Sequence, residues 1–236
     1  MSGDLSATMR DYLVEIYRLS EGARVVFGDA PATNSDYVTT SALAELLDVS
    51  APAVNRMVTR LREMGLVEHE PYQGICLTPD GKREALKELR RQRIAESFLV
   101  EVMGFDWQEI DDEADRIAGA MSDKLAERML EMAGNPTQCP HGEPIPTADG
   151  TLPGQDDFLL STVEAGADLQ ITRIRTRERD RLEYLTALGL LPGTTFHLLN
   201  VAPFNGPMQL KLGDEYRIIG YNLAELIWVR KVTGNE

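Results

Sequence analysis

Four polar side chains recur at helical spacing between Ser50 and Gly65, and their chemistry suits duplex DNA. Projection at 100° per residue places them on one helix face, opposite the apolar residues. Arg and Asn side chains can read base edges in the major groove, whereas Arg and Thr can contact phosphates. The candidate residues are Asn55 and Arg56 for base edges, and Thr59 and Arg60 for the backbone.

The flanking sequence predicts a winged helix-turn-helix around this face. Thr40 to Leu47 has the apolar spacing of a short helix, Ser50 is positioned to cap the next helix, and Gly65 is positioned to end it. The segment 66–77 then reads as a β-hairpin, which is the order of a winged helix-turn-helix. Further expected DNA contacts are Thr40, Ser50, Pro52, Ala53 and Tyr72. A solvated face on an ordinary three-helix domain is the alternative reading.

The remaining sequence predicts a fold that is mainly α with a β C-terminal domain. The expected helices are Asp11–Ser20, Lys82–Met103, Trp107–Met121 capped by Asp106, and Asp123–Ala133 capped by Ser122. Residues 22–38 read as a loop, and the Pro- and Gly-rich residues 134–157 read as a domain boundary. From Phe158 onward, five short strands and a helix at Arg179–Leu188 indicate a small barrel.

Composition limits the possible partners. Lys and Arg total 24 against 38 Asp and Glu, a net charge of −14, which argues against an unspecific polyanion binder. Residues 1–100 hold 12 basic and 15 acidic side chains, so any DNA contact belongs there. Two cysteines cannot form a disulfide framework, and no apolar run approaches the roughly 20 residues needed to cross a bilayer. We expect a cytoplasmic protein without a membrane partner.

An enzyme is the main alternative class. The acids Asp111, Asp112, Glu113 and Asp115 could form a carboxylate-rich metallohydrolase site. However, the sequence has only three His residues, no Ser/His/Asp, Cys/His or HExxH constellation, and no phosphate-binding Gly-rich loop after a strand. We therefore expect no enzyme and no small organic substrate. A pure protein-interaction module is a further alternative, and it would have no affinity for DNA at low salt.

Several segments, in this order, resemble the DtxR/MntR family of metal-dependent transcriptional regulators. They are DYLVEIYRL, VTTSALAELLDVSAPAVNRMVTRLREMGLVEHEPYQGICLTPDG, RIAESFLVEVMGFDWQEIDDEADRI, MSDKLAERM and CPHGEPIP. The resemblance implies a winged helix-turn-helix DNA-binding domain over 1–83, a helical dimerisation and metal-binding domain over 84–150, and an SH3-like FeoA domain over 151–236. It also implies a homodimer on a palindromic operator, with Mn, Fe or Zn as cofactor.

The primary metal site implied by the resemblance is altered in this sequence. Asp11 matches a family ligand on the first helix, but Val14 stands where manganese-type members have a second acid. On the dimerisation helix, the ligand positions hold Asp111 and Asp115, one turn apart, and then two residues that cannot coordinate through side chains, Ala118 and Gly119. Without an imidazole, such a site favours hard cations or binds transition metals weakly.

An ancillary metal site is also implied by the resemblance. Glu96 and the CPHG motif, with Cys139 and His141, match ligand positions found in some members, although Gln92 replaces a family histidine. Glu178 and Asp180 are the nearest candidates for a fourth ligand. A thiolate, an imidazole and a carboxylate suit Zn(II), Fe(II) or Mn(II). The alternative is a Pro-rich turn that needs no metal.

The expected function is a DNA-binding repressor of metal-ion homeostasis with a divalent metal as co-effector. The second hypothesis keeps DNA binding but replaces metal sensing, for instance by redox sensing at Cys139 or by constitutive binding of the dimer.

Overall fold

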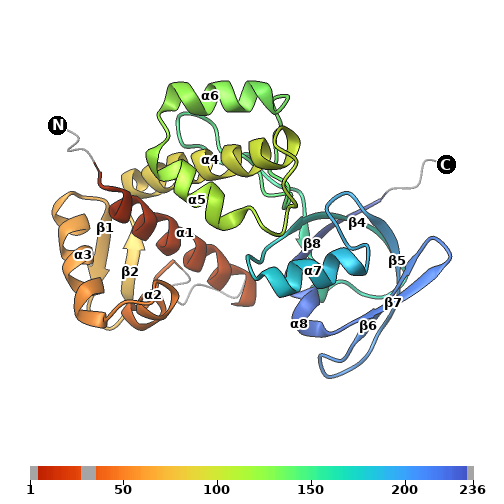
Figure 1. Cartoon of the computed structure of the whole chain (residues 1–236). Coiled ribbons are helices and arrows are strands. Elements are labelled where there is room, and N and C mark those ends of the chain that lie inside the picture. Colours follow the sequence, from red (N-terminus) through yellow and green to blue (C-terminus); the bar gives the residue numbers. More distant parts are fainter. Residues whose placement is uncertain (1–4, 28–35, 233–236) are drawn as a thin grey trace. The chain divides into compact units, whose positions relative to one another are not determined.

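The structure, a computed structural model, describes residues 5–27 and 36–232 and divides into two compact units. The first unit comprises 1–92, 118–121 and 146–152, and the second comprises 93–117, 122–145 and 153–236. Helix α4 (Pro79–Glu101) contributes residues to both units. Figure 1 colours the chain by residue number, so the elements of each unit can be followed separately.

The first unit contains the predicted winged helix-turn-helix. Its elements are α1 (Ala7–Phe27), α2 (Thr40–Leu46), α3 (Ala51–Glu63), β1 (Val67–Glu70) and β2 (Gly74–Leu77). Thr39 Oγ1 accepts a hydrogen bond from the Ala42 amide at 3.1 Å and so begins α2. Gly65 follows α3 and has a φ of +74°, the left-handed conformation that commonly ends a helix. Strands β1 and β2 pair antiparallel from Val67 opposite Leu77 to Glu70 opposite Gly74.

The apolar faces of these elements form one core. Its fully buried members include Leu13, Ile16, Leu43, Leu61 and Ile75. From α3 it includes Val54, Val58 and Leu61, which confirms the predicted apolar face of that helix. The polar face of α3 therefore lies outside the core.

Two predictions in this unit were wrong in detail. Helix α1 continues to Phe27, although residues 22–38 were expected to be a loop; a glycine inside a helix costs only about 1 kcal/mol, which a long helix tolerates. The rest of that expected loop, residues 28–35, lies outside the described residues. Ser50 does hold the N-cap position of α3, but its side chain makes no capping hydrogen bond.

A buried acid on α4 links that helix to α1. The Glu88 side chain is 2% exposed, and its Oε2 lies 3.1 Å from Arg10 Nε and 2.7 Å from Arg91 Nη1. The same Arg10 side chain also donates to the Gly119 carbonyl at 2.9 Å. Glu88 therefore balances two partly buried cations at the centre of the first unit.

Replacing Glu88 with alanine is expected to destabilise the chain by about 3 kcal/mol, because it leaves buried cationic groups without their counter-charge. Urea unfolding measures the loss. The matched control is Glu84→Ala on the same helix, whose partner Lys87 lies at 2.9 Å but whose side chain is 30% exposed. That control is expected to cost less than about 0.5 kcal/mol. Equal losses for the two variants would refute the central role of Glu88.

The second unit combines helices with an antiparallel sheet. Helices α5 (Asp111–Ala120) and α6 (Asp123–Met132) follow α4. The last three residues of α5, 118–120, belong to the first unit. The Ser122 side chain caps α6 by accepting from the Leu125 amide at 3.3 Å. The six strands are β3 (Phe158–Leu159), β4 (Ala167–Ile174), β5 (Thr195–Val201), β6 (Met208–Leu212), β7 (Glu215–Ile219) and β8 (Ile227–Lys231). Their order in the sheet is β3-β8-β4-β5-β6-β7.

The β domain therefore confirms the predicted fold class, with additions. Helix α7 (Arg179–Ala187) lies where a helix was expected, and α8 (Tyr221–Ala224) is an extra short helix. The two-residue strand β3 escaped prediction because two residues carry no alternation pattern. No helix in residues 5–27 and 36–232 has the length and apolarity to span a membrane.

One helix start in this unit was predicted wrongly. Helix α5 begins at Asp111 rather than at Trp107, and Asp106 does not cap it. Residues 107–109 form a turn instead, in which the Glu109 amide donates to the Asp106 carbonyl at 3.0 Å. Trp107 is held by tertiary contacts that a continuous helical pattern does not reveal, including a hydrogen bond from Nε1 to Thr186 Oγ1 at 3.0 Å.

Candidate metal centre

Three different metal-binding side chains meet in the second unit. Glu96 lies on α4, and Cys139 and His141 lie in the loop after α6. One potential ligand atom from each falls within 4.8 Å of the others, and all three residues are buried. Among the described residues, these three form the group of three or more His, Cys, Asp or Glu side chains whose ligand atoms lie this close together. The structure thus brings together three residues more than 40 positions apart at their extremes, as the ancillary site requires.

The loop that carries Cys139 and His141 is fixed by its own backbone. The Gly142 amide donates to the Cys139 carbonyl at 2.8 Å, and the Ile174 amide of β4 donates to the His141 carbonyl at 2.8 Å. Gly142 has a φ of +80°, and a Cβ there would lie 2.0 Å from the Thr172 carbonyl oxygen. Only glycine fits at this position, because any side chain would collide with the β4 backbone.

Polar atoms inside the cluster face one another without hydrogen bonds. His141 Nδ1 lies 3.6 Å from Glu96 Oε2, and His141 Nε2 lies 4.0 Å from Asp111 Oδ2. The buried atoms that lack a hydrogen-bond partner among the described residues include Glu96 Oε2, Asp111 Oδ2 and His141 Nε2. A buried polar atom without a partner lowers the stability of the fold. A divalent cation would remove this penalty, because these oxygen and nitrogen atoms can coordinate it. The residues therefore fit a metal ion.

The electrostatics of the cluster also fit a cation. Burial opposes ionisation of Glu96, but His141, Cys139 and Arg177 together outweigh it and lower the pKa of Glu96 to about 2. Burial lowers the pKa of His141, yet Glu96 and Asp111 raise it above its usual value. Burial raises the pKa of Cys139 well above that of a free thiol, and Glu96 adds to the effect. A metal ion would displace the thiol proton, since the thiolate is the ligand form.

A tryptophan covers one side of His141. The ring centroids of Trp107 and His141 are 5.1 Å apart, with the planes tilted by 47°. Because Trp107 is itself held by Thr186 of α7, its ring has a fixed place beside the imidazole. Rigid neighbours of this kind orient a ligand before the metal arrives.

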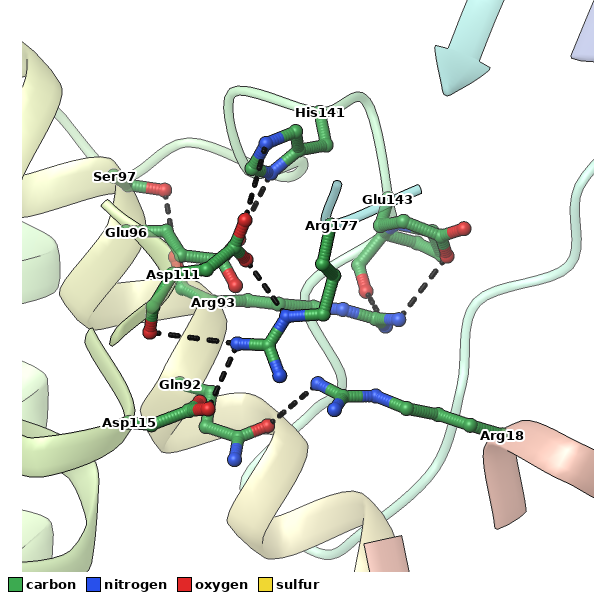
Figure 2. A network of polar contacts seen from close by, with 11 residues as sticks. Arg18, Gln92, Arg93, Glu96, Ser97, Asp111, Asp115, His141, Glu143 and Arg177 are labelled. Carbon is green, nitrogen blue, oxygen red and sulfur yellow. Dashed lines mark hydrogen bonds and ion pairs between the residues drawn. The ribbon is translucent and has the colours of Figure 1, made fainter. Parts of the chain in front are cut away.

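The acids of α5 have a partner that sequence reasoning missed. Arg177, between β4 and α7, donates from Nε to Asp111 Oδ1 at 2.8 Å and from Nη2 to Asp115 Oδ2 at 2.9 Å. Figure 2 shows the guanidinium pointing at both acids, with His141 above Asp111 and Glu96. Burial lowers the pKa of Arg177, but Asp115 and Asp111 raise it beyond its ordinary value. No sequence pattern identified Arg177, because its partners are more than 60 residues away.

The other predicted metal residues lie in different surroundings. Asp11 is an exposed residue of α1 in the first unit, and Gln92 is buried there and accepts from Arg18 Nη2 at 3.0 Å. Glu178, the suggested fourth ligand, is 63% exposed and pairs with Arg181 at 2.8 Å. Asp111 is instead the acid that lies next to His141.

The predicted DNA-contacting side chains are mostly accessible. Asn55, Arg56, Thr59 and Arg60 are exposed on α3, as are Ser50 and Pro52 at its start. Ala53 and Thr40 are half-buried, and Tyr72 is fully exposed in the β1–β2 turn at a φ of +67°. Thr59 Oγ1 donates to the Asn55 carbonyl at 2.8 Å, so its hydroxyl hydrogen is already used within the helix. The side chains on this face can therefore reach a partner without rearrangement of the fold.

A winged helix-turn-helix with an exposed polar recognition helix, together with a buried carboxylate, thiol and imidazole cluster and a β domain, defines the class of metal-dependent DNA-binding regulators. Comparison with known families agrees along the chain. Residues 29–75 match the iron dependent repressor N-terminal DNA binding domain, residues 78–147 match the iron dependent repressor metal binding and dimerisation domain, and residues 158–231 match the FeoA domain.

Relatives that match most of the chain are repressors of the same kind. The diphtheria toxin repressor of Corynebacterium efficiens is 30% identical over 246 residues, covering 98% of each chain. The iron-dependent repressor IdeR of Mycobacterium tuberculosis is 30% identical over 202 residues, covering 80% of this chain and 87% of the relative. The chain belongs to the iron-dependent repressor family, also called the DtxR/MntR family, which confirms the resemblance seen in its sequence. This is a family of transcriptional repressors and not of enzymes.

Solved structures extend the likeness to three dimensions. A manganese-dependent transcriptional repressor in complex with manganese superposes with a TM-score of 0.83 at 31% identity, covering 95% of this chain and all of the other. The repressor ScaR with bound Zn²⁺ superposes with a TM-score of 0.78 at 28% identity, covering 95% and 99%. The fold of nearly the whole chain is thus found in relatives of known structure.

Proposed function

We propose that this chain is a transcriptional repressor of metal-ion homeostasis, which binds a palindromic DNA operator as a homodimer and responds to a divalent metal ion. The observation that carries the DNA part is the exposed polar face of α3, followed directly by a hairpin with Tyr72 at its turn. Asn55 and Arg56 would contact base edges, and Arg60 would contact phosphates. Thr59 would join Arg60 at the phosphates once its hydroxyl turns away from the Asn55 carbonyl. DNA binding places the proposed activity in the cytoplasm.

The proposed dimer surface lies on the second unit. Large apolar side chains are exposed at the end of α4 and after it, including Met103 at 55%, and along α6, where Leu125 and Met132 are 48% and 51% exposed. Exposed apolar groups of this size mark an interaction surface, and a two-fold symmetric pair is the common solution. The match of residues 78–147 to a metal binding and dimerisation domain supports the same assignment.

The proposed metal ligands are Glu96, Cys139 and His141, with Asp111 as the nearest further acid. Relatives of known structure are named for manganese, zinc and cadmium complexes. The thiolate and imidazole favour Zn(II) or Fe(II), and the carboxylates keep Mn(II) within reach. When bound, the ion would supply positive charge that joins α4 to the 139–142 loop. Trp107 would remain beside the His141 ring as a neighbour that holds it in place.

A selection experiment tests the DNA-binding part. The full chain, loaded with Mn²⁺, is incubated with a library of randomised duplexes, and the bound sequences are amplified and read. We expect palindromes whose half-sites are about one helical turn apart, because a two-fold dimer presents two α3 helices. Native mass spectrometry of the selected duplex should then find two chains per duplex. Binding of single chains without any palindromic preference would rule out the proposal.

A second candidate function is a regulator of the same family that has lost metal sensing at its primary site and binds its operator without metal control. The observation that favours it is the loss of coordinating side chains at Ala118 and Gly119, together with the pairing of Asp111 and Asp115 with Arg177. The two candidates differ in one result: only the first makes operator affinity depend on metal.

A further inference from the structure

We propose that Arg177 takes the place of a second divalent cation at the acid pair Asp111 and Asp115. In this arrangement the chain supplies its own positive charge at α5 and leaves the Glu96, Cys139 and His141 cluster for metal. The inference builds on the metal site proposed above, but it does not depend on DNA binding.

The contacts of Arg177 are those of a counter-ion shared by two acids. One guanidinium reaches Asp111 Oδ1 at 2.8 Å through Nε and Asp115 Oδ2 at 2.9 Å through Nη2. The two acids are four residues apart on α5, so they project from one helix face. Two carboxylates this close repel each other unless a cation lies between them, and a guanidinium supplies both charge and directed donors.

A second observation shows that this place is built for a cation. His141 is 6% exposed at its side chain, and its Nε2 has no hydrogen-bond partner among the described residues. That atom lies 4.0 Å from Asp111 Oδ2, whereas Arg177 Nε donates to the other carboxylate oxygen, Oδ1. Two carboxylates and an imidazole are a common ligand set for a divalent ion. Removal of the guanidinium would therefore leave two carboxylates and an imidazole that can bind a divalent cation.

Arg177 and the two acids come from different parts of the second unit, so their ion pairs connect those parts. Arg177 lies between β4 and α7 of the β domain, whereas Asp111 and Asp115 belong to α5. Arg179 repeats this link, because its Nη2 donates to Glu109 Oε1 at 2.6 Å. Ion pairs of Arg177 and Arg179 thus join the β domain to the start of α5 and to the turn before it.

Counting bound Mn²⁺ tests the inference on the full chain. Free Mn²⁺ is followed by electron paramagnetic resonance during titration of the wild type, Arg177→Gln and Arg177→Lys. Arg179→Gln is the matched control, since it removes a nearby arginine that pairs with other acids. We expect Arg177→Gln to bind one more Mn²⁺ per chain than the wild type. Arg177→Lys and Arg179→Gln should bind the same number as the wild type. Equal numbers for Arg177→Gln and the wild type overturn the inference.

Two further measurements keep the test decisive. Asp115→Asn in the Arg177→Gln background should abolish the additional ion. In the otherwise wild-type chain, Asp115→Asn should leave the number of bound ions unchanged, because Arg177 rather than metal occupies the acid pair. A loss of one ion in that single variant contradicts the inference, even if Arg177→Gln does not fold. Failure of the proposed metal site looks different: Cys139→Ser would then change neither the ion count nor the affinity.

Discussion

Replacing Cys139 with serine will lower the affinity of the chain for Zn²⁺ by more than about 100-fold. Cys139 is the one thiol in the buried cluster, and Zn²⁺ binds thiolates in preference to hydroxyls. Loss of outer-shell partners alone costs about 10- to 100-fold in metal affinity, and loss of a direct ligand costs at least as much. Competition with a chromophoric chelator measures the change.

The second free cysteine provides the matched control for this prediction. Cys76 lies on β2 in the first unit, outside the cluster, so Cys76→Ser should retain the wild-type affinity for Zn²⁺. His141→Ala should resemble Cys139→Ser, because it removes the imidazole between Glu96 and Asp111. Wild-type affinity in both cluster variants would show that the 139–142 loop is a structural turn without a metal.

Arg56→Ala will weaken binding to the selected operator by about 1 to 3 kcal/mol, or about 5- to 150-fold, and will relax the sequence preference at one base pair of each half-site. Arg56 is exposed on α3 in the face that also carries Asn55. A bidentate arginine contact to a guanine accounts for discrimination of this size. Fluorescence anisotropy with operator and random duplexes measures both affinities.

Arg60 offers a contrast on the same helix. Arg60→Ala should weaken operator and random DNA alike and lower the salt dependence of binding by about one counterion per chain, as expected for a phosphate contact. Arg230→Ala, on β8 of the second unit, removes the same charge from the β domain and should leave both affinities unchanged. If Arg56→Ala weakens random DNA as much as the operator, Arg56 does not read bases.

Local patterns were sufficient to predict most of the fold. The 3.6-residue spacing of Val54, Val58 and Leu61 defined the buried face of α3, and the alternation in β4 to β8 defined the sheet domain. The errors occurred where tertiary contacts outweigh local pattern. Trp107 is held by Thr186 and lies beside His141, and this explains why α5 begins only at Asp111.

The site was less predictable than the fold. Glu96, Cys139 and His141 could be identified by resemblance, and the structure brings their ligand atoms within 4.8 Å. Arg177 could not be identified in this way, because a surface-type residue in a charged segment carries no periodicity that points to α5. Its pairing with Asp111 and Asp115 depends on how β4 and α7 are placed, which is information that only the folded chain contains.

Arginine contacts are found at the positions where this chain departs from the metal ligands of the family. Gly119 has no coordinating side chain, but its carbonyl accepts from Arg10 at 2.9 Å in the first unit. In the second unit, Asp111 and Asp115 both pair with Arg177. Guanidinium contacts therefore occur at three positions that the family resemblance assigns to metal ligands, and the thiol-containing cluster remains as the proposed site for a metal ion.

The affinity of the wild-type homodimer for its selected operator, measured with and without a chelator, distinguishes metal-controlled from metal-independent binding. We expect that chelation lowers the affinity by at least about 10-fold, that Mn²⁺, Fe²⁺ or Zn²⁺ restores it, and that Cys139→Ser prevents the restoration. Unchanged affinity in the chelator, with the same dimer on the same operator, would contradict metal control and leave the metal-independent regulator.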